Sequence, residues 1–297
     1  MLVDEQHRFG VAQRLALKNK APEAPHVLLM SATPIPRTLA LTLYGDLEIS
    51  SIDTMPQERK VIQTHLVRKG NDSKLYEFIR GELAASRQAY FICPLIDEDE
   101  ELRSVEQMQA ELESVFPQYP LAVVHGRMSP EQKYAAMDAF RAGKVRILLA
   151  TTVVEVGIDV ASASVIAIEH AERFGLAQLH QLRGRVGRGL DQGYCFLVYE
   201  NEGLSSLAKE RLMTLKNCHD GFAIAEKDLE LRGPGDLLGK DQSGCMELRI
   251  AEIPADLECL EYARRDAVEL LERDFGLLQA ENQGLRQALL GKDSLDA

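Results

Sequence analysis

Short apolar runs alternate with amphipathic stretches from residue 26 to about residue 200. Apolar runs of this kind, separated by segments long enough for a helix, are typical of parallel strands joined by crossover helices. Strands are predicted at 26–30, 89–96, 121–125, 145–150, 164–170 and 193–200, and amphipathic helices at 72–86, 102–115 and 129–142. The last helix opens with Ser129-Pro130-Glu131, a favourable helix start. The pattern therefore predicts a doubly wound α/β fold around a parallel sheet.

The chain changes character at two places. The stretch 53–60 is polar and contains proline, which is typical of a boundary. After about residue 200 the strand pattern stops, and helical stretches at 203–218 and 256–273 flank a glycine-rich turn at 231–244. The polar tail beyond residue 280 is expected to fray. We therefore predict three parts, at 1–58, 59–200 and 201–297. The first is too short for a complete α/β domain, and the last is a helical hairpin region with a loop and a C-terminal helix.

Composition narrows the class of protein. The 297 residues, 45% of them apolar, are enough for roughly two domains with their own cores. No apolar run approaches the length of about 18 residues that spans a bilayer, and the N-terminus lacks a signal-peptide layout; we therefore expect no membrane partner and a cytoplasmic location. Five cysteines are scattered without a CxxC pair, which favours reduced structural thiols. The net charge of −12 means that any contact with nucleic acid must be local.

The first candidate for chemistry is "MLVDEQH", in which Asp4 and Glu5 follow an apolar run that reads as the end of a buried strand. Paired carboxylates at such a place can hold Mg²⁺ and polarise a water, although the same pattern also arises by chance at strand ends. The turn "SATPIPRT" at 31–38 follows the strand 26–30, at the carboxyl edge where open α/β sheets bind ligands. We expect the Ser31 and Thr33 hydroxyls to bond towards the two carboxylates; an ordinary loop is the alternative.

Two further stretches carry candidate residues. In "TTVVEVGIDV", Gly157 allows close backbone approach and Asp159 can accept from a ribose or an arginine, a weak signal by itself. "QLHQLRGRVGRG" at 178–189 is stronger, because Arg185 and Arg188 are three residues apart and lie among glycines. We expect a flexible, uncluttered turn that projects both guanidinium groups towards a phosphate; a solvated basic loop is the alternative. The local basic cluster formed with Arg183 is assigned to the same site.

A charged residue interrupts the apolar stripe of the helix at 203–218. Leu204, Ala208, Arg211 and Leu215 are spaced four, three and four apart, so they share one helical face. Arg211 could simply lay its methylene stem along that face and lift its head to solvent. Alternatively, we hypothesise that Arg211, Arg232 and Gln242 form one polar network that holds the glycine-rich loop against the hairpin.

Taken in order, DEQH, SATPIPRT, TTVVEVGID and QxxGRxGR resemble the motifs of superfamily-two helicases over nearly the whole chain. "DEQHRFGV" together with "RGPGDLLG" and "QSG" resembles the RecG family, whose nearest relative, the coupling factor Mfd, typically has DEEQ and RGAG instead. The resemblance implies a parallel-sheet RecA-like helicase lobe, preceded by a truncated lobe and followed by a helical hairpin region. It also implies an ATP-driven motor on branched double-stranded DNA at stalled forks, and by family analogy a single-stranded DNA-binding protein as a possible partner.

The resemblance assigns a role to each candidate residue. Asp4 would hold Mg²⁺, Glu5 would activate the attacking water, and Gln6 and His7 would couple the site to the DNA side. Arg185 and Arg188 would reach the γ-phosphate of ATP, and the remaining nucleotide-lining residues would be Gly157, Asp159 and Gln181. Arg211, Arg232 and Gln242 match the family's translocation motif. Lys240-Asp241 stands where the family usually has Thr-Arg, which weakens any contact of this loop with phosphate.

No stretch of the sequence matches the phosphate loop G-x-x-x-x-G-K-[ST]. Gly-Lys pairs occur at 143–144, 239–240 and 291–292, and none has the upstream glycine or the following hydroxyl. We therefore expect the carboxyl-terminal portion of such a motor, cut near the magnesium strand and inactive alone. The alternatives are a module that docks DNA or a protein without hydrolysing anything, and a fragment of the coupling factor.

Overall fold

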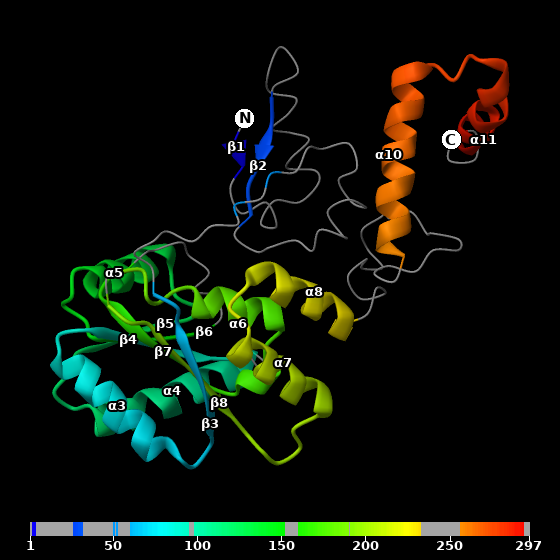
Figure 1. The fold of residues 1–297 in the computed structure, drawn as a ribbon. Coiled ribbons are helices and arrows are strands. Elements are labelled where there is room, and N and C mark those ends of the chain that lie inside the picture. Colours follow the sequence, from blue (N-terminus) through cyan, green and yellow to red (C-terminus); the bar gives the residue numbers. More distant parts are fainter. Residues whose placement is uncertain are drawn as a thin grey trace. The chain divides into compact units, whose positions relative to one another are not determined.

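The computed structural model describes residues 2–3, 26–31, 50, 52, 60–94, 98–151, 160–189, 191–232 and 256–293. The chain divides into two compact units, the first ending at Leu231 and the second containing residues 256–293 (Figure 1). The prediction that residues 1–58, 59–200 and 201–297 form separate parts stays a prediction.

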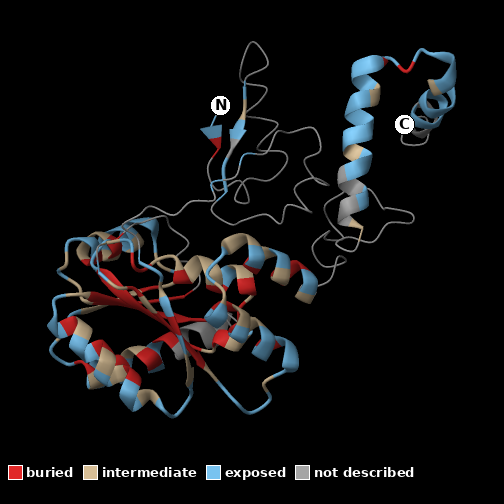
Figure 2. Cartoon of the chain, in the orientation of Figure 1, coloured by how far each residue is buried: buried red, intermediate tan, exposed pale blue. Residues whose placement is uncertain are grey.

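A six-stranded parallel sheet forms the centre of the first unit. Its strands are β3 (Gln63–Arg68), β4 (Gln88–Cys93), β5 (Leu121–Val124), β6 (Ile147–Thr151), β7 (Ala163–Ile168) and β8 (Tyr194–Tyr199). They lie in the order β3-β8-β7-β4-β6-β5. Every residue of β4, β6 and β7 is buried, because strands covered on both faces lose access to solvent along their whole length (Figure 2). The predicted α/β class with a parallel sheet is confirmed.

Helices cover both faces of this sheet. One face packs against α3 (Asp72–Ala84) and α4 (Glu98–Val115), which contribute Ile79 and Leu112 to its core. The other face packs against α5 (Pro130–Arg141), α6 (Leu176–Arg183), α7 (Ser206–Asn217) and the first turns of α8 (Gly221–Arg232). The two cores take alternate residues of the same strands, as the pleat requires. The unit therefore has three layers, with α7 and the start of α8 part of its core.

Local sequence explains where several helices begin. The Ser129 side chain accepts from the Gln132 amide at 3.3 Å, and the Ser129 amide donates to Gln132 Oε1 at 3.0 Å, so the predicted start of α5 is a capping box. The Ser205 hydroxyl accepts from the Ala208 amide at 3.1 Å and starts α7 in a similar way. These caps fix the orientation of the chain where it enters each helix.

One strand and two α-helices of the first unit were not predicted. Strand β3 lies at the edge of the sheet, where one side stays exposed, so its sequence QTHLVR lacks an apolar run. Helix α6 occupies part of the stretch interpreted as a glycine-rich turn, and α8 follows α7 directly. Strand β3 lacks an apolar run, α6 has only eight residues, and the apolar residues of α8 do not gather on one face, so none of the three shows a clear periodic pattern.

The second unit contains α10 (Leu257–Arg273) and α11 (Gln283–Asp293), joined through the short helix η3 (Ala280–Asn282). Helix α10 was predicted, whereas the expectation of a frayed tail beyond residue 280 is wrong for the part that forms α11. The Asp274 carboxylate accepts from the amides of Leu278 and Gln279 at 2.8 and 3.0 Å, and from Asn282 Nδ2 at 2.9 Å. A single carboxylate therefore organises the connection between the two helices.

A separate pair of short parallel strands, β1 (Leu2–Val3) and β2 (Leu28–Leu29), lies near the N-terminus of the chain. Val3 is buried, but Leu2 is 72% exposed and Leu28 is 53% exposed, so the expected buried strand is only half correct. Two strands by themselves cannot cover both of their faces. In the part of the chain that the structure describes, no helix is long and apolar enough to cross a membrane.

Candidate functional site

The structure describes about half of the predicted site residues. Asp4, Glu5, Gln6, His7, Thr33, Gly157, Asp159 and Gln242 lie outside the described residues, and Arg232 is described as the last residue of α8 without its side chain. Ser31, Gln181, Arg185, Arg188 and Arg211 are described with their surroundings. These five residues and their neighbours make up the described part of the site.

Ser31 follows the pair of short strands. The Met30 amide donates to the Val3 carbonyl at 2.8 Å, so the chain that leads to Asp4 and the chain that leads to Ser31 run side by side in the same direction. Parallel neighbours end at the same edge of a sheet. This is the arrangement that the predicted contact between Ser31 and the carboxylates requires, and the contact itself lies outside the described residues.

The stretch with Arg185 and Arg188, residues 184–189, follows α6 directly and is called the arginine turn below. It lies beside the amino-terminal ends of β7 and β8, since the Gly187 amide donates to the Ala163 carbonyl at 3.4 Å and Gly187 packs against Gly193. Strand β6, which leads into "TTVVEVGIDV", has its carboxyl-terminal end at Thr151, on the side of the sheet opposite to the amino-terminal ends of β7 and β8. The two predicted nucleotide-facing stretches therefore start from opposite ends of the strands.

The glycines of the arginine turn serve close packing. A Cβ atom on Gly189 would lie 2.6 Å from the Ala161 carbonyl oxygen, and one on Gly193, just after the turn, would lie 2.8 Å from the Gly187 Cα. Gly187 also has a φ of +67°, a conformation that other residues rarely adopt. The expectation of an uncluttered turn is wrong, because the glycines let three backbone segments touch.

The two arginines of the turn differ in exposure. Arg188 is exposed and its Nε donates to the Gly184 carbonyl at 3.0 Å, while Arg185 is half-buried and its amide donates to the Leu182 carbonyl at 3.0 Å. Gln181 is half-buried on the last turn of α6. A planar guanidinium held on a fixed backbone is suited to bind a phosphate through two parallel hydrogen bonds.

Arg183 has a different role from the one predicted. Its side chain is buried, with the residue only 4% exposed, and its Nη1 donates to the carbonyls of Leu215 and Cys218 at 2.7 and 2.9 Å. Its Nη2 lies 3.1 Å from His180 Nδ1. Burial lowers the pKa of the Arg183 guanidinium, and burial followed by the charge of Arg183 lowers the pKa of His180 to about 4. The expectation that Arg183 belongs to the basic nucleotide-facing cluster is therefore wrong; Arg183 holds the carboxyl end of α7 against α6.

Arg211 makes a second link between α7 and the segment before α6. Its Nη1 donates to the Phe174 carbonyl at 2.9 Å and its Nη2 donates to the Glu172 carbonyl at 3.2 Å. Glu172 belongs to a short helix, η2 (Ala171–Arg173), that follows β7. Arg211 thus bonds to backbone instead of lifting its head to solvent. The hypothesised network with Arg232 and Gln242 lies outside the described side chains.

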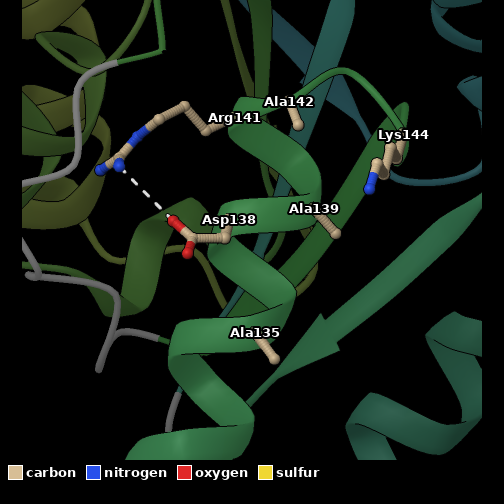
Figure 3. A pocket seen from close by; sticks show the side chains of 6 residues that line it. All are labelled: Ala135, Asp138, Ala139, Arg141, Ala142 and Lys144. Atoms are coloured by element: carbon tan, nitrogen blue, oxygen red, sulfur yellow. Dashed lines mark hydrogen bonds and ion pairs between the residues drawn. The ribbon is translucent and has the colours of Figure 1, made fainter.

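A groove of about 610 Å³ runs along α5 and is lined by none of these residues (Figure 3). Its lining consists of Ala135, Asp138, Ala139, Arg141, Ala142 and Lys144. Arg141 Nη1 lies 3.4 Å from Asp138 Oδ1, so two of the three charged side chains that line this groove pair with each other. No group of three or more histidine, cysteine, aspartate or glutamate side chains suited to a metal ion occurs among the described residues.

The fold and the arginine turn define a class of protein. Residues 70–189 match the family model described as "Helicase conserved C-terminal domain". A helicase of the Lhr type from Mycobacterium smegmatis has the same fold, with a TM-score of 0.52 and 19% identity over 72% of this chain and 30% of that one. The first unit is a RecA-like helicase lobe, as the motif order predicted.

The particular family follows from closer relatives. Residues 218–294 match the model described as "ATP-dependent DNA helicase RecG, domain 3, C-terminal". The RecG helicase of Treponema pallidum (strain Nichols) is 48% identical over 94% of this chain and 42% of its own length, and that of Bacillus subtilis (strain 168) is 44% identical over 100% and 43%. A structure of RecG bound to a three-way DNA junction has a TM-score of 0.68 and 44% identity over 88% of this chain and 33% of that one.

The chain belongs to the RecG family of DNA helicases and corresponds to its carboxyl-terminal portion. It spans about two fifths of the length of the curated relatives that it matches. The predicted family is confirmed, and the alternative of a coupling-factor fragment is not favoured.

Proposed function

We propose that this chain is the second motor lobe and the duplex lever of an ATP-dependent double-stranded DNA translocase. The motor would remodel stalled replication forks and recombination junctions by branch migration. The observation that carries the proposal is the arginine turn, which is fixed by backbone packing on a lobe whose α6 is tied to α7. Branched DNA as the substrate is supported by the relative described as bound to a three-way DNA junction.

The proposed roles follow the chemistry of the residues. Arg185 and Arg188 would contact the phosphates of ATP, since two guanidinium groups on a rigid base match phosphate geometry. Asp4 would hold Mg²⁺ and Glu5 would orient a water, both of which suit carboxylates after a strand. Bound ATP would supply the free energy for movement. The other proposed contacts to the nucleotide are those of Gly157, Asp159 and Gln181, and the proposed coupling residues are Gln6, His7, Ser31 and Thr33.

The proposed lever consists of Arg211, Arg232 and Gln242 at the hairpin and its loop. The bonds from Arg211 to the Phe174 and Glu172 carbonyls support it, because they join α7 to the segment that precedes α6, the helix that leads into the arginine turn. The proposed division into parts 1–58, 59–200 and 201–297 separates this lever from the motor lobes in sequence. A single-stranded DNA-binding protein at forks stays a proposed partner. The proposed location is the cytoplasm.

The proposal is tested with two proteins. In the first, the 297-residue chain is assayed alone; we expect almost no DNA-stimulated ATP hydrolysis, because its sequence has no phosphate loop. In the second, the chain replaces the matching 43% of the Bacillus subtilis relative. This chimera should hydrolyse ATP in the presence of branched DNA and unwind a model fork.

The outcomes separate the motor from a docking module. A chimera that binds the fork but neither hydrolyses ATP nor unwinds it would favour the docking module, and robust ATP hydrolysis by the chain alone would also contradict the proposal. In an active chimera, Arg211→Ala should retain most ATP hydrolysis and lose unwinding. Parallel losses of hydrolysis, unwinding and melting temperature would make Arg211 a structural residue instead.

A further inference from the structure

The three residues that lead into the sheet, Lys60, Val61 and Ile62, lie against the arginine turn; we call them the leading segment. The Gln192 Nε2 donates to the Val61 carbonyl at 2.6 Å, which joins two residues that are 131 positions apart. The Ile62 side chain lies 3.3 Å from where a Cβ on Gly187 would stand. The leading segment therefore makes an apolar contact with the arginine turn and a polar contact with Gln192, just after the turn.

Gln192 is placed between the turn and the leading segment. It follows the arginine turn by three positions and precedes β8 by two. The same Nε2 also donates to the Gly193 carbonyl at 3.0 Å, and that carbonyl accepts from the Gln63 amide at 2.9 Å, the first bond between β3 and β8. The side chain is only half-buried, so its role is to fasten these strands together and not to fill a core.

A second anchor holds the other side of the same stretch. Arg87 Nη2 donates to Asp191 Oδ1 at 2.9 Å, and Arg87 Nη1 donates to both carboxylate oxygens of Glu82 at 2.8 and 2.9 Å. Glu82 lies on α3 and also accepts from the Ser164 hydroxyl at 2.7 Å. Asp191 is thus fastened to a helix inside the lobe, whereas Gln192 is fastened to the segment through which the chain enters it.

The leading segment has space beside it. A cavity of about 180 Å³ separates it from α6 and from the start of α8. The cavity is lined by Lys60, Val61, Ile62, His180, Arg183, Gly184, His219 and Gly221. Residues next to an unfilled volume lose packing contacts on that side. The side of the leading segment that faces α6 and α8 therefore borders an unfilled volume.

We propose that Gln192 is a positioning residue of the motor, which transmits the position of the leading segment to Arg185 and Arg188. The inference rests on the proposed function. In the proposed division of the chain, Lys60 is where the connection from the first lobe enters the second. A shift of that connection moves Val61, and the bond to Gln192 together with the contact between Ile62 and Gly187 carries the shift to the turn. Small displacements matter here, because an error of about 1 Å in a catalytic group costs about 100-fold in rate.

The first test uses the active chimera and compares Gln192→Met, which keeps the length of the side chain and removes the donor, with Gln192→Lys, which keeps a donor. Gln192→Met should lower kcat for ATP hydrolysis by about tenfold and leave the KM for ATP within about twofold, since the turn is displaced while binding is retained. Gln192→Lys should restore kcat to within about twofold of the parent. Gln109→Met is the matched control, because Gln109 Nε2 donates to Glu113 Oε1 at 2.8 Å on the surface of α4.

The second test uses the 297-residue chain alone and follows amide hydrogen exchange, so it is independent of ATP hydrolysis. Gln192→Met should speed exchange across residues 184–189 and at Gln63, whereas Gln109→Met should leave them unchanged. Unchanged exchange in the turn overturns the inference whether or not the chimera is a motor. A kcat within twofold of the parent, or a loss that parallels melting temperature and is not restored by Gln192→Lys, also overturns it. A parent chimera without activity counts against the proposed function alone.

Discussion

Replacing Arg183 by methionine should destabilise the helicase lobe more than any exposed arginine substitution. The guanidinium is buried and donates to the carbonyls of Leu215 and Cys218. Hydrogen bonds from a charged donor contribute about 1.5–3 kcal/mol each, net of exchange with water. Two such bonds lost, with methionine filling most of the space, give an expected loss of about 3 kcal/mol in the free energy of unfolding.

The measurement is urea denaturation of the 297-residue chain, followed by circular dichroism at constant pH because the sequence has no tryptophan. Arg141→Met is the matched control, since Arg141 lies on the surface of α5 and pairs only loosely with Asp138 at 3.4 Å. We expect it to change the free energy of unfolding by less than about 0.5 kcal/mol. A loss below about 1 kcal/mol for Arg183→Met, or one equal to the control, would refute the assigned role.

The same substitution has a pH signature. The pKa of His180 is lowered to about 4, first by burial and then by the charge of Arg183. The folded lobe therefore binds fewer protons than the unfolded chain between pH 6.5 and about 4, so this group removes stability as pH falls through that window. In Arg183→Met the pKa of His180 should rise and the loss should shrink. An unchanged His180 titration by NMR would show that the guanidinium does not act on this ring.

Three further predictions follow from the two units. In the active chimera, Arg185→Ala and Arg188→Ala should each lower ATP turnover by about 10³-fold and leave the affinity for the fork nearly unchanged. An ATPase assay measures the first effect, and filter binding measures the second. Gly189→Ala should cost about 1–3 kcal/mol in denaturation, because its Cβ would meet a carbonyl oxygen at 2.6 Å, whereas Gly81→Ala on α3, with nothing within 4 Å, should be neutral or stabilising. The hydrogen bond from Asn282 is the main cause that lowers the pKa of Asp274 below its ordinary value of 3.8. The connection between α10 and α11 should therefore persist down to pH 3.8 and loosen as the pH falls through the lowered pKa of the folded protein. Asp274→Asn should abolish this pH dependence in NMR spectra.

The sequence predicted the central strands well because they are buried on both faces. Residues 147–151 and 163–168 are fully buried, so they appear as continuous apolar runs. Strand β3 was missed for the opposite reason, since it is an edge strand in which only Thr64 is buried. Helix α6 was missed because glycines nearby suggested a turn, whereas its own eight residues contain none.

The motif predicted a phosphate-facing role for the arginine turn, but the sequence did not show why the turn contains glycines. The sequence selected Arg185 and Arg188 because a planar guanidinium can bind a phosphate through two parallel hydrogen bonds, and their contact with a nucleotide stays a prediction. The reason for the glycines depends on Ala161 and Gly193, which come close only after folding. Arg183 could not be separated from its neighbours by sequence, since its acceptors are backbone carbonyls 32 and 35 positions away and carbonyls leave no mark on residue identity.

The two arginine links to α7 share a property that bears on how a motor of this kind would work. Arg183 bonds to carbonyls near the end of α7, and Arg211 bonds from α7 to carbonyls that precede α6. Arg183 donates from α6 and Arg211 donates from α7. Sliding of α7 past α6 would therefore break the bonds of both arginines. All four acceptors are backbone oxygens, so the links do not depend on the protonation of a carboxylate. The arginine turn, α6 and α7 should therefore move as one body.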